Sequence, residues 1–248
     1  MSLATLSFNG PIATLSLNRP DARNSLSTDL LDALHARVDE LAASSHAAVA
    51  IVTGEGKAFC AGMDLKAVLD NNSLALRLLT GLAELTHKLR ALPQVTVARV
   101  NGAAIGGGCG LTTVCDLSAT HADAKVGFPE IDLGVCPAVV APWLVRKVGA
   151  GRARVILLKG GLMSGTQAQG CGLVDHCVPT LADLDALVGD LATRLAGGGP
   201  DAIRATKGLL NEIDGSTNLD LLRCAARLSA EVLATPEAQR RLREKLAK

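Results

Sequence analysis

Two glycine-containing turns carry the backbone groups with which this chain could do chemistry. The first, residues 100–111, contains Gly106-Gly107-Gly108 and follows the apolar run 95–99. The second, residues 54–66, follows the apolar run 48–53. Each pattern predicts a buried strand that turns directly into a helix, whose first N–H groups have no partner within that helix. Two such N–H groups can bind one developing oxyanion, and loss of one typically costs about 2.7–4 kcal/mol of transition-state stabilisation.

Glycine-rich turns also occur in nucleotide-binding loops and where a helix packs closely on a strand. A dinucleotide loop needs G-x-G-x-x-G with an acidic residue about twenty positions later, and a P-loop needs Gly-Lys-Ser/Thr after its glycines. Here Gly110 is followed by Leu111, and neither motif is completed. Close packing of a helix on a strand, with no ligand, is the other interpretation of an isolated glycine triplet. The presence of a second turn of the same kind favours the oxyanion site.

Successive motifs along the chain resemble those of the crotonase family, the enoyl-CoA hydratase/isomerase fold. The resemblance covers about residues 5 to 190, and the helical tail fits the remainder. The matching segments are Asn18-Arg19-Pro20, Asn24-Ser25-Leu26, Ala58 to Leu65, Asn101-Gly102 with Gly106 to Gly108, Phe128-Pro129-Glu130 and Leu133-Gly134.

The resemblance implies a reaction on the thioester of an acyl-CoA. The backbone N–H groups of Met63 and Gly107 would hold the thioester oxygen and stabilise an enolate. Hydratases of the family use two glutamates, and the first of those positions is Gly110 in this chain, with no carboxylate until Asp116. The second is Glu130. A single acid fits either a shift of a double bond between the 3,4 and 2,3 positions or a single-acid hydration.

Glu130 also has a plainer interpretation. A glutamate after Pro129 is typical of a solvent-facing residue at a helix start. Its place at the second catalytic position of the family favours the catalytic role. We expect Phe128, Ile131 and Val135 to line its pocket and burial to raise its pKa. A non-catalytic acyl-CoA-binding relative, a thioester hydrolase and a decarboxylase remain open as alternatives.

The substrate is expected to bring coenzyme A with it, so no permanently bound cofactor and no metal is predicted. By motif, the residues predicted to contact CoA are Ala22, Arg23, Ala61, Met63, Asp64, Leu65 and Lys66. The basic residues of the last helix, Arg240, Arg241, Arg243, Lys245 and Lys248, indicate either a solvated helix face or phosphate contacts. Cys60, Cys109 and Cys136 lie near the predicted site, where small buried thiols are commonly core residues.

The sequence predicts an α/β fold in which strands are followed by helices, and the resemblance implies that these units stack on one another. Asn9-Gly10 is typical of a tight turn in a hairpin. Ser27 is placed to cap the helix that follows it, and Ser164 with Gln167 predicts a capping box ahead of another short helix. The other expected elements are strands 48–53, 95–100 and 117–120, helices 28–42, 74–92 and 181–195, and helices 201–213, 217–234 and 236–247 after the linker 197–200. The resemblance implies a crotonase-like spiral of ββα units over 1–196, a C-terminal helical region over 197–248, and a homotrimer or a hexamer made of two trimers.

Composition limits the class of protein. The chain has 248 residues, a formal net charge of +1, 2% aromatic residues and no tyrosine. A nucleic-acid partner is not expected, because both the positive charge and the stacking rings are lacking. The seven cysteines form no C-x-x-C pair, which favours reduced thiols in a cytoplasmic protein. No membrane partner is expected either, and the resemblance implies a place in acyl-CoA or fatty acid metabolism.

Overall fold

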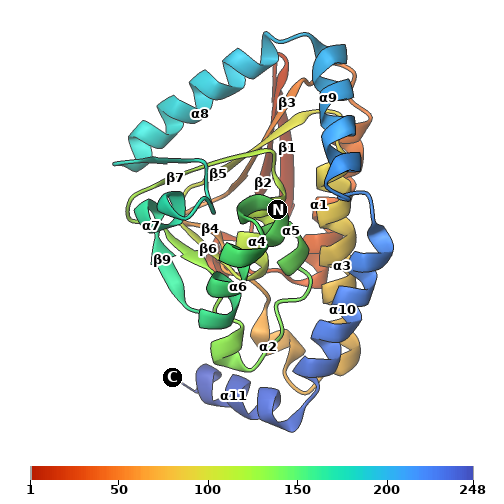
Figure 1. Cartoon of the computed structure of the whole chain (residues 1–248), viewed down its shortest axis with the longest axis vertical. Coiled ribbons are helices and arrows are strands. Elements are labelled where there is room, and N and C mark those ends of the chain that lie inside the picture. The colour runs from red at the N-terminus through yellow and green to blue at the C-terminus, as the bar shows by residue number, and fades with distance from the viewer. Residues whose placement is uncertain (1, 248) are drawn as a thin grey trace.

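The computed structural model describes residues 2–247, which form two β-sheets flanked by helices (Figure 1). The six-stranded sheet has the order β1 (Ala4–Asn9), β2 (Ile12–Leu17), β3 (Val49–Gly54), β5 (Val95–Val100), β7 (Leu117–His121) and β10 (His176–Val178). The four-stranded sheet has the order β4 (Ala58–Cys60), β6 (Ala103–Ile105), β8 (Lys125–Gly127) and β9 (Leu162–Ser164). The β1–β2 and β8–β9 pairs are antiparallel, and the other neighbours are parallel.

Three successive passes of the chain build both sheets together. β3 is followed by β4, β5 by β6 and β7 by β8, so each pass adds one strand to each sheet. This arrangement corrects one expectation from the sequence, which predicts that each glycine turn leads from a strand straight into a helix. The short strands β4 and β6 lie between the turn and the helix. The sequence does not predict them, because a run of three residues is too short to show the alternation that marks a strand.

The predicted hairpin and the predicted long helices are confirmed. In the β1–β2 hairpin, Asn9 pairs with Ile12, and Gly10 adopts a positive φ of 57°. The long helices of the first part are α1 (Thr28–Ala42), α3 (Asn72–Ala91) and α8 (Leu181–Ala196), and the C-terminal ones are α9 (Pro200–Ile213), α10 (Leu219–Leu233) and α11 (Pro236–Leu246). The shorter helices are α2 (Leu65–Val68), α4 (Gly107–Val114), α5 (Ala141–Val148), α6 (Ala150–Lys159) and α7 (Gly165–Gly170).

Side chains that precede the helices explain several of their starts. Ser27 Oγ accepts a hydrogen bond from the N–H of Leu30 at 3.2 Å and so caps α1. Ser164 and Gln167 form the capping box that the sequence predicts at the start of α7. Each cap satisfies a backbone N–H that the helix itself cannot satisfy, which fixes where the helix begins.

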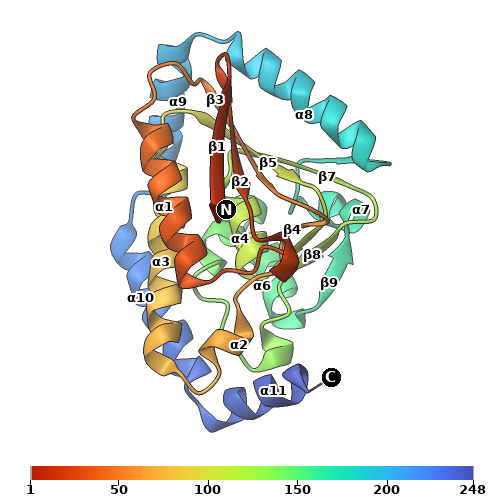
Figure 2. The same cartoon turned by 180° about the vertical axis from the view of Figure 1, so that it is seen from behind.

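Helices α1, α3 and α10 lie side by side on one flank of the molecule, as both views show (Figures 1 and 2). α10 buries Leu222, Ala226 and Leu233 in the same core cluster as Leu78 and Leu82 of α3. Helix α10 is therefore part of the main core, and the division of the chain at residue 197 stays a prediction. Within residues 2–247, no helix combines the length and the hydropathy that a membrane span requires.

Candidate active site

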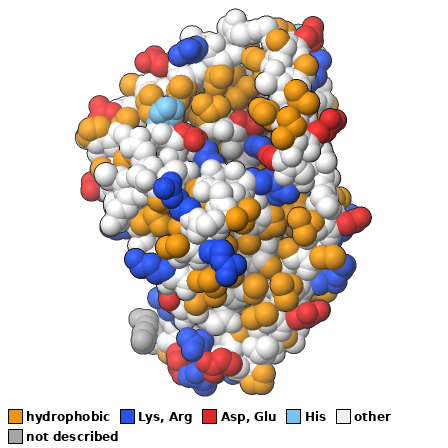
Figure 3. Space-filling view, viewed as in Figure 1, with side chains coloured by type: hydrophobic (Ala, Val, Ile, Leu, Met, Phe, Trp, Pro, Cys, Tyr) orange, Lys and Arg blue, Asp and Glu red, His pale blue; other side chains and the backbone are white. Residues whose placement is uncertain are grey.

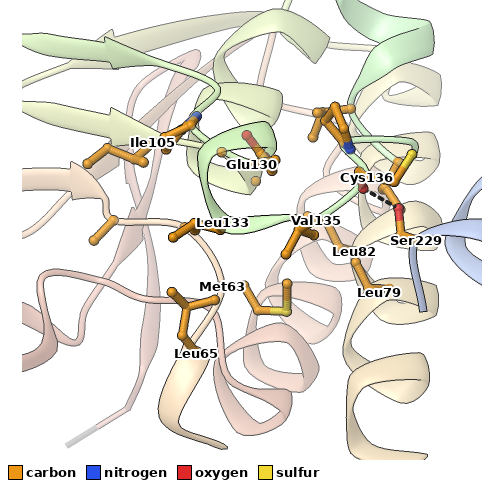
Figure 4. Close-up of a pocket in the computed structure, with 18 of the residues that line it drawn as sticks. Met63, Leu65, Leu79, Leu82, Ile105, Glu130, Leu133, Val135, Cys136 and Ser229 are labelled. Carbon is orange, nitrogen blue, oxygen red and sulfur yellow. Dashed lines mark hydrogen bonds between the residues drawn. The ribbon is translucent and has the colours of Figure 1, made fainter. Parts of the chain in front are cut away.

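A cavity of about 400 Å³ lies where the two glycine turns meet α3, α10 and the loop 129–140 (Figure 4). The Glu130 side chain points into it from that loop, while Leu79 and Leu82 enter from α3. Apolar side chains form most of the lining. The cavity thus brings together segments from the first half of the chain, the middle and the C-terminal region.

The N–H group of Met63 faces the cavity because the flanking backbone groups, the carbonyl of Gly62 and the N–H of Asp64, are hydrogen-bonded to Leu26 on the opposite side of the segment. Leu26 pairs with Met63 in a short parallel bridge. In this bridge the N–H of Leu26 donates to the carbonyl of Gly62 at 2.7 Å, and the N–H of Asp64 donates to the carbonyl of Leu26 at 2.9 Å. Successive N–H groups in an extended chain point to opposite sides, so that of Met63 points away from Leu26. Within residues 2–247 it donates no hydrogen bond.

The N–H group of Gly107 lies beside this segment. Gly107 is the first residue of α4, and no acceptor within the described part of the chain takes its N–H. A Cβ built on Gly62 would lie 4.0 Å from the nitrogen of Gly107 and 2.7 Å from the carbonyl oxygen of Ile105. The two turns are therefore in direct contact, as the sequence predicts, and only a glycine at residue 62 permits it.

Asn24 holds the turn formed by residues 54–66 in place. Its Oδ1 accepts a hydrogen bond from the N–H of Arg19 at 2.8 Å, while its Nδ2 donates to the carbonyls of Glu55 and Ala58 at 2.9 and 2.8 Å. Asn24 is fully buried and has a positive φ of 55°, a conformation that asparagine adopts more readily than most residues. Its structural role was not part of the sequence prediction, although an asparagine in a turn motif is a signal for it.

Asn101 holds the start of the same turn, directly after β3. Its Oδ1 accepts from the N–H of Gly54 at 3.3 Å, and its Nδ2 donates to the carbonyl of Gly56 at 3.0 Å. Because Asn101 directly follows β5, it ties the end of that strand to the 54–56 turn. The relative position of the two glycine turns thus depends on two buried asparagines.

Glu130 stands at the start of a short 3₁₀ helix, Ile131–Leu133, but it does not cap that helix. Although the residue is partly exposed, its Oε2 is buried and has no hydrogen-bond partner within residues 2–247. Burial raises the pKa of this carboxyl from 4.5 to about 7, because the charged form is poorly solvated, and contact with its own backbone N–H lowers it slightly. The interpretation as a solvated helix-start residue is therefore wrong.

The surroundings of Glu130 differ in part from the expectation. Val135 lines the cavity as predicted. Phe128 is 1% exposed but packs in the core away from the cavity, and Ile131 is 40% exposed. Gly106 is instead the close neighbour, since a Cβ at this residue would lie 2.8 Å from Oε1 of Glu130. The carboxyl thus lies directly against the glycine turn that precedes α4.

No space for a second carboxylate exists at Gly110. A Cβ built on Gly110 would overlap Cγ1 of Val140, so a valine fills the position. Asp116, the next acid along the chain, does not reach the cavity. Its carboxylate pairs with Lys207 at 2.7 Å and with Arg90 at 3.4 Å. Glu130 is thus the one buried carboxylate that lines the cavity within residues 2–247.

The residues predicted to contact CoA divide into two groups. Those that line the cavity are Arg23, Ala61, Met63 and Leu65, and those that do not are Ala22, Asp64 and Lys66. The Asp64 carboxylate pairs with Arg19 at 2.9 Å, and Lys66 is exposed. The CoA contacts remain predictions.

The structure distinguishes among the basic residues that the sequence places on the last helix, α11. Arg240, Arg241 and Arg243 of this helix form ion pairs with carboxylates of Glu237, Glu244 or Asp70. Lys245 lines the cavity mouth and has no carboxylate partner within residues 2–247. Lys248, which the sequence grouped with these residues, lies outside the described residues. The C-terminal helix therefore presents a single cation of this group to the cavity.

The thiols near the site are not activated. Burial raises the pKa of Cys60 to about 12 and raises that of Cys109 far above its usual range, so both are protonated at neutral pH. Within residues 2–247, no three His, Cys, Asp or Glu side chains come together in a way that could hold a metal ion.

Comparisons with known proteins agree on one family. Its model, described as enoyl-CoA hydratase/isomerase, matches residues 7–244. The chain is 35% identical over 238 residues to a putative enoyl-CoA hydratase of Thermus thermophilus, covering 94% of each protein. It is 34% identical over 213 residues to the 2,3-dehydroadipyl-CoA hydratase of Escherichia coli, covering 86% of this chain and 83% of that protein.

Solved structures show the same fold. The chain superposes on an enoyl-CoA hydratase from Bacillus halodurans with a TM-score of 0.91 at 23% identity, over 98% of this chain and 100% of that one. An enoyl-CoA hydratase from Bacillus anthracis superposes with a TM-score of 0.80 at 30% identity, over 91% and 90% of the two chains. With this fold, this site and the family match over nearly its whole length, the chain belongs to the enoyl-CoA hydratase/isomerase family and has the crotonase fold.

Proposed function

We propose that this protein moves the double bond of an enoyl-CoA between the 3,4 and 2,3 positions, with Glu130 as its single acid/base. The observation that carries the proposal is the buried Oε2 of Glu130, which has no partner in the described chain and belongs to the side chain that points into the cavity. Val140 closes the position at Gly110. One carboxyl group is enough for this reaction, because it can remove a proton from one carbon and return it to another.

The proposed step begins with the thioester oxygen accepting hydrogen bonds from the N–H groups of Met63 and Gly107. The Glu130 carboxylate removes a proton from C2 of a 3-enoyl thioester, and the C–H electron pair is delocalised onto the thioester oxygen. Glu130 then gives the same proton to C4, so that the double bond lies between C2 and C3 and the carboxylate is regenerated. A pKa of about 7 suits a group that must both accept and donate a proton near neutral pH.

Hydration of a 2-enoyl-CoA is the second candidate. It is favoured by the names of the relatives in Thermus thermophilus and Escherichia coli, both of which are called hydratases. In this reaction Glu130 takes a proton from water as the oxygen attacks C3, and it supplies the proton that C2 gains. The same residue and the same two N–H groups serve both candidates.

Absorbance of the conjugated enoyl thioester distinguishes the candidates. With a 3-enoyl-CoA, isomerisation makes the absorbance rise, and with a 2-enoyl-CoA, hydration makes it fall. Either change should be lost in Glu130→Gln, whereas the exposed variant Asp123→Asn should keep it. If neither substrate changes the absorbance while CoA esters still bind, the protein is a non-catalytic relative or catalyses another reaction, which release of free CoA or carbon dioxide would identify.

CoA is proposed to lie along residues 61–66, with the cations at the cavity mouth near its phosphates. Arg23 and Lys245 line the mouth, and Lys66 is exposed on the same segment of chain. Ala22, Ala61, Met63, Asp64 and Leu65 are proposed to contact CoA through their backbone. Arg23→Ala and Lys245→Ala should each weaken CoA binding, and calorimetry would measure the change.

We propose the homotrimer, or hexamer of two trimers, that the family resemblance implies, and the exposed apolar residues of the C-terminal helices support an assembly through this region. Leu209, Leu210 and Ile213 of α9 are all more than half exposed, and Figure 3 shows hydrophobic side chains on the face that carries α9 and α10. Apolar patches of this kind typically mark protein–protein contacts. Sedimentation equilibrium would give the mass of the assembly, and a monomer would contradict the proposal.

A further inference from the structure

The candidate cavity has a charged mouth and an apolar closed end. Arg23, Asp132 and Lys245 line the mouth, and all three are exposed. The other end is built from side chains that are at most 5% exposed, namely Leu78, Leu79, Leu82, Val139 and Val140. Figure 4 shows Leu79 and Leu82 of α3 near Cys136 and Ser229 at this end. A ligand that fills the cavity therefore passes from a charged to an apolar environment.

Ser229, the one residue with a hydroxyl group among the described residues that line the cavity, already has hydrogen-bond partners. Ser229 Oγ donates a hydrogen bond to the carbonyl of Cys136 at 2.8 Å and accepts one from the N–H of Ala138 at 3.2 Å. Its single proton is therefore not available to a ligand. Among the described residues that line the cavity, the only cations are Arg23 and Lys245, both at the mouth. Within residues 2–247, the closed end thus offers no cationic side chain to a negative charge.

The reactive groups fix which part of a substrate reaches the closed end. Figure 4 shows Glu130 and Met63 beside the closed end, and a Cβ built on Gly107 would lie 3.0 Å from a methyl group of Leu82. The thioester would be held at these groups. With the thioester there, the diphosphate of CoA extends to the cations of the mouth and the acyl chain extends toward Leu79 and Leu82. The opposite orientation would bury phosphates against leucines, which is strongly unfavourable.

We propose that this site selects acyl groups whose far end is uncharged and apolar, and that it rejects acyl groups that end in a carboxylate. The proposal rests on the function proposed above, because it takes the cavity as the acyl-CoA site. A carboxylate at the closed end would lose its hydration and gain no ion pair with a described residue of the lining. The chain would differ in this respect from its Escherichia coli relative, whose name specifies a dehydroadipyl, and therefore dicarboxylic, substrate.

Binding of two saturated, unreactive esters tests the proposal without depending on turnover. Hexanoyl-CoA and adipoyl-CoA have the same six-carbon chain and differ in a terminal carboxylate. By titration calorimetry on the full-length protein, we expect hexanoyl-CoA to bind more tightly than CoA alone. We expect adipoyl-CoA to bind at least about tenfold more weakly than hexanoyl-CoA, because its charge is left unpaired.

Two variants locate the selection within the cavity. Leu79→Phe reduces the space at the closed end, so it should weaken the binding of hexanoyl-CoA while leaving the affinity for acetyl-CoA nearly unchanged. Arg23→Ala should lower the affinities for hexanoyl-CoA, adipoyl-CoA and CoA by the same factor. Thermal unfolding of each variant shows whether it is folded, and the comparison in the unaltered protein does not depend on either of them.

The outcomes separate this inference from the proposed function. Equal affinity for hexanoyl-CoA and adipoyl-CoA, or tighter binding of adipoyl-CoA, would overturn the inference even if enoyl-CoA turnover is observed. Failure of every CoA ester to bind would overturn the proposed function and the inference with it. Selective binding of hexanoyl-CoA without turnover would support the inference and contradict the assignment of the reaction.

Discussion

Replacing Glu130 with glutamine should abolish turnover and, at the same time, stabilise the fold at neutral and higher pH. Both effects have one cause, since the buried carboxyl must ionise to act as a base and its burial opposes ionisation. Glutamine has nearly the same shape but carries no charge at any pH. The variant therefore removes the proton acceptor and the unfavourable buried charge together.

The shift in the pKa of Glu130 sets the size of the stability effect. The pKa is about 7 in the folded protein against 4.5 for an ordinary glutamate, so the folded state holds the proton more tightly than the unfolded state. The stability associated with this group is fully present below pH 4.5 and is lost as the pH rises through 7. The shift corresponds to a loss of about 3 kcal/mol in the free energy of unfolding of the unaltered protein between these two pH values. The glutamine variant, which carries no ionisable group at residue 130, should not show this loss.

Urea unfolding across this pH range measures the effect. The free energies of unfolding of Glu130→Gln and the unaltered protein should be similar near pH 4.5, and the variant should become the more stable by up to about 3 kcal/mol above pH 7. The exposed carboxylate variant Asp123→Asn is the matched control and should show no such difference. All three proteins are compared at one concentration, because association would add to the apparent stability.

The rate profile supplies an independent readout of the same group. For isomerisation, kcat/KM should rise with pH through about 7, since only the carboxylate can accept the first proton. The reasoning would be refuted by a glutamine variant no more stable than the unaltered protein at pH 8.5. It would also be refuted by a kcat/KM that is flat between pH 5 and 8 while the chemical step limits the rate.

Three further substitutions test the packing around the site. Gly110→Glu should lower the melting temperature because its Cβ overlaps Val140, and Val140→Ala in the same chain should restore much of the loss; equal melting temperatures would contradict the overlap. Ser229→Ala should cost about 1–3 kcal/mol in urea unfolding and raise KM, because two backbone groups of the cavity wall lose their partner. Lys207→Met should cost about 1.5–3 kcal/mol in urea unfolding, because the partly buried Asp116 loses its closest cation but keeps Arg90, and it should leave KM unchanged in steady-state assays.

Local residue patterns were sufficient for the regular elements. Asn9-Gly10 predicted the hairpin, Ser27 the start of α1, and the capping box at Ser164 the start of α7. These signals work because each one is satisfied by groups within a few residues along the chain. The strands β4, β6, β8 and β9 were not predicted, since three residues show no period and their stability comes from neighbours distant in sequence.

The site was predicted in part. The two glycine turns indicated paired N–H donors, and the family motifs indicated Met63, Gly107 and Glu130 as the residues to consider. Position alone, however, favoured a solvated residue at 130. Its burial arises because the loop 129–140 folds over the cavity and is held by Ser229 of α10, a contact that no local pattern encodes.

The amino-acid sequence by itself determined the class of fold, the order of the long elements, the family and the absence of a carboxylate at residue 110. Only the tertiary structure decided that Val140 fills that position, that the carboxyl of Glu130 loses its solvent, and that the far end of the cavity is apolar. The physical reason is that composition and periodicity are properties of neighbouring residues. Desolvation and steric exclusion depend instead on which distant side chains the packed core brings together.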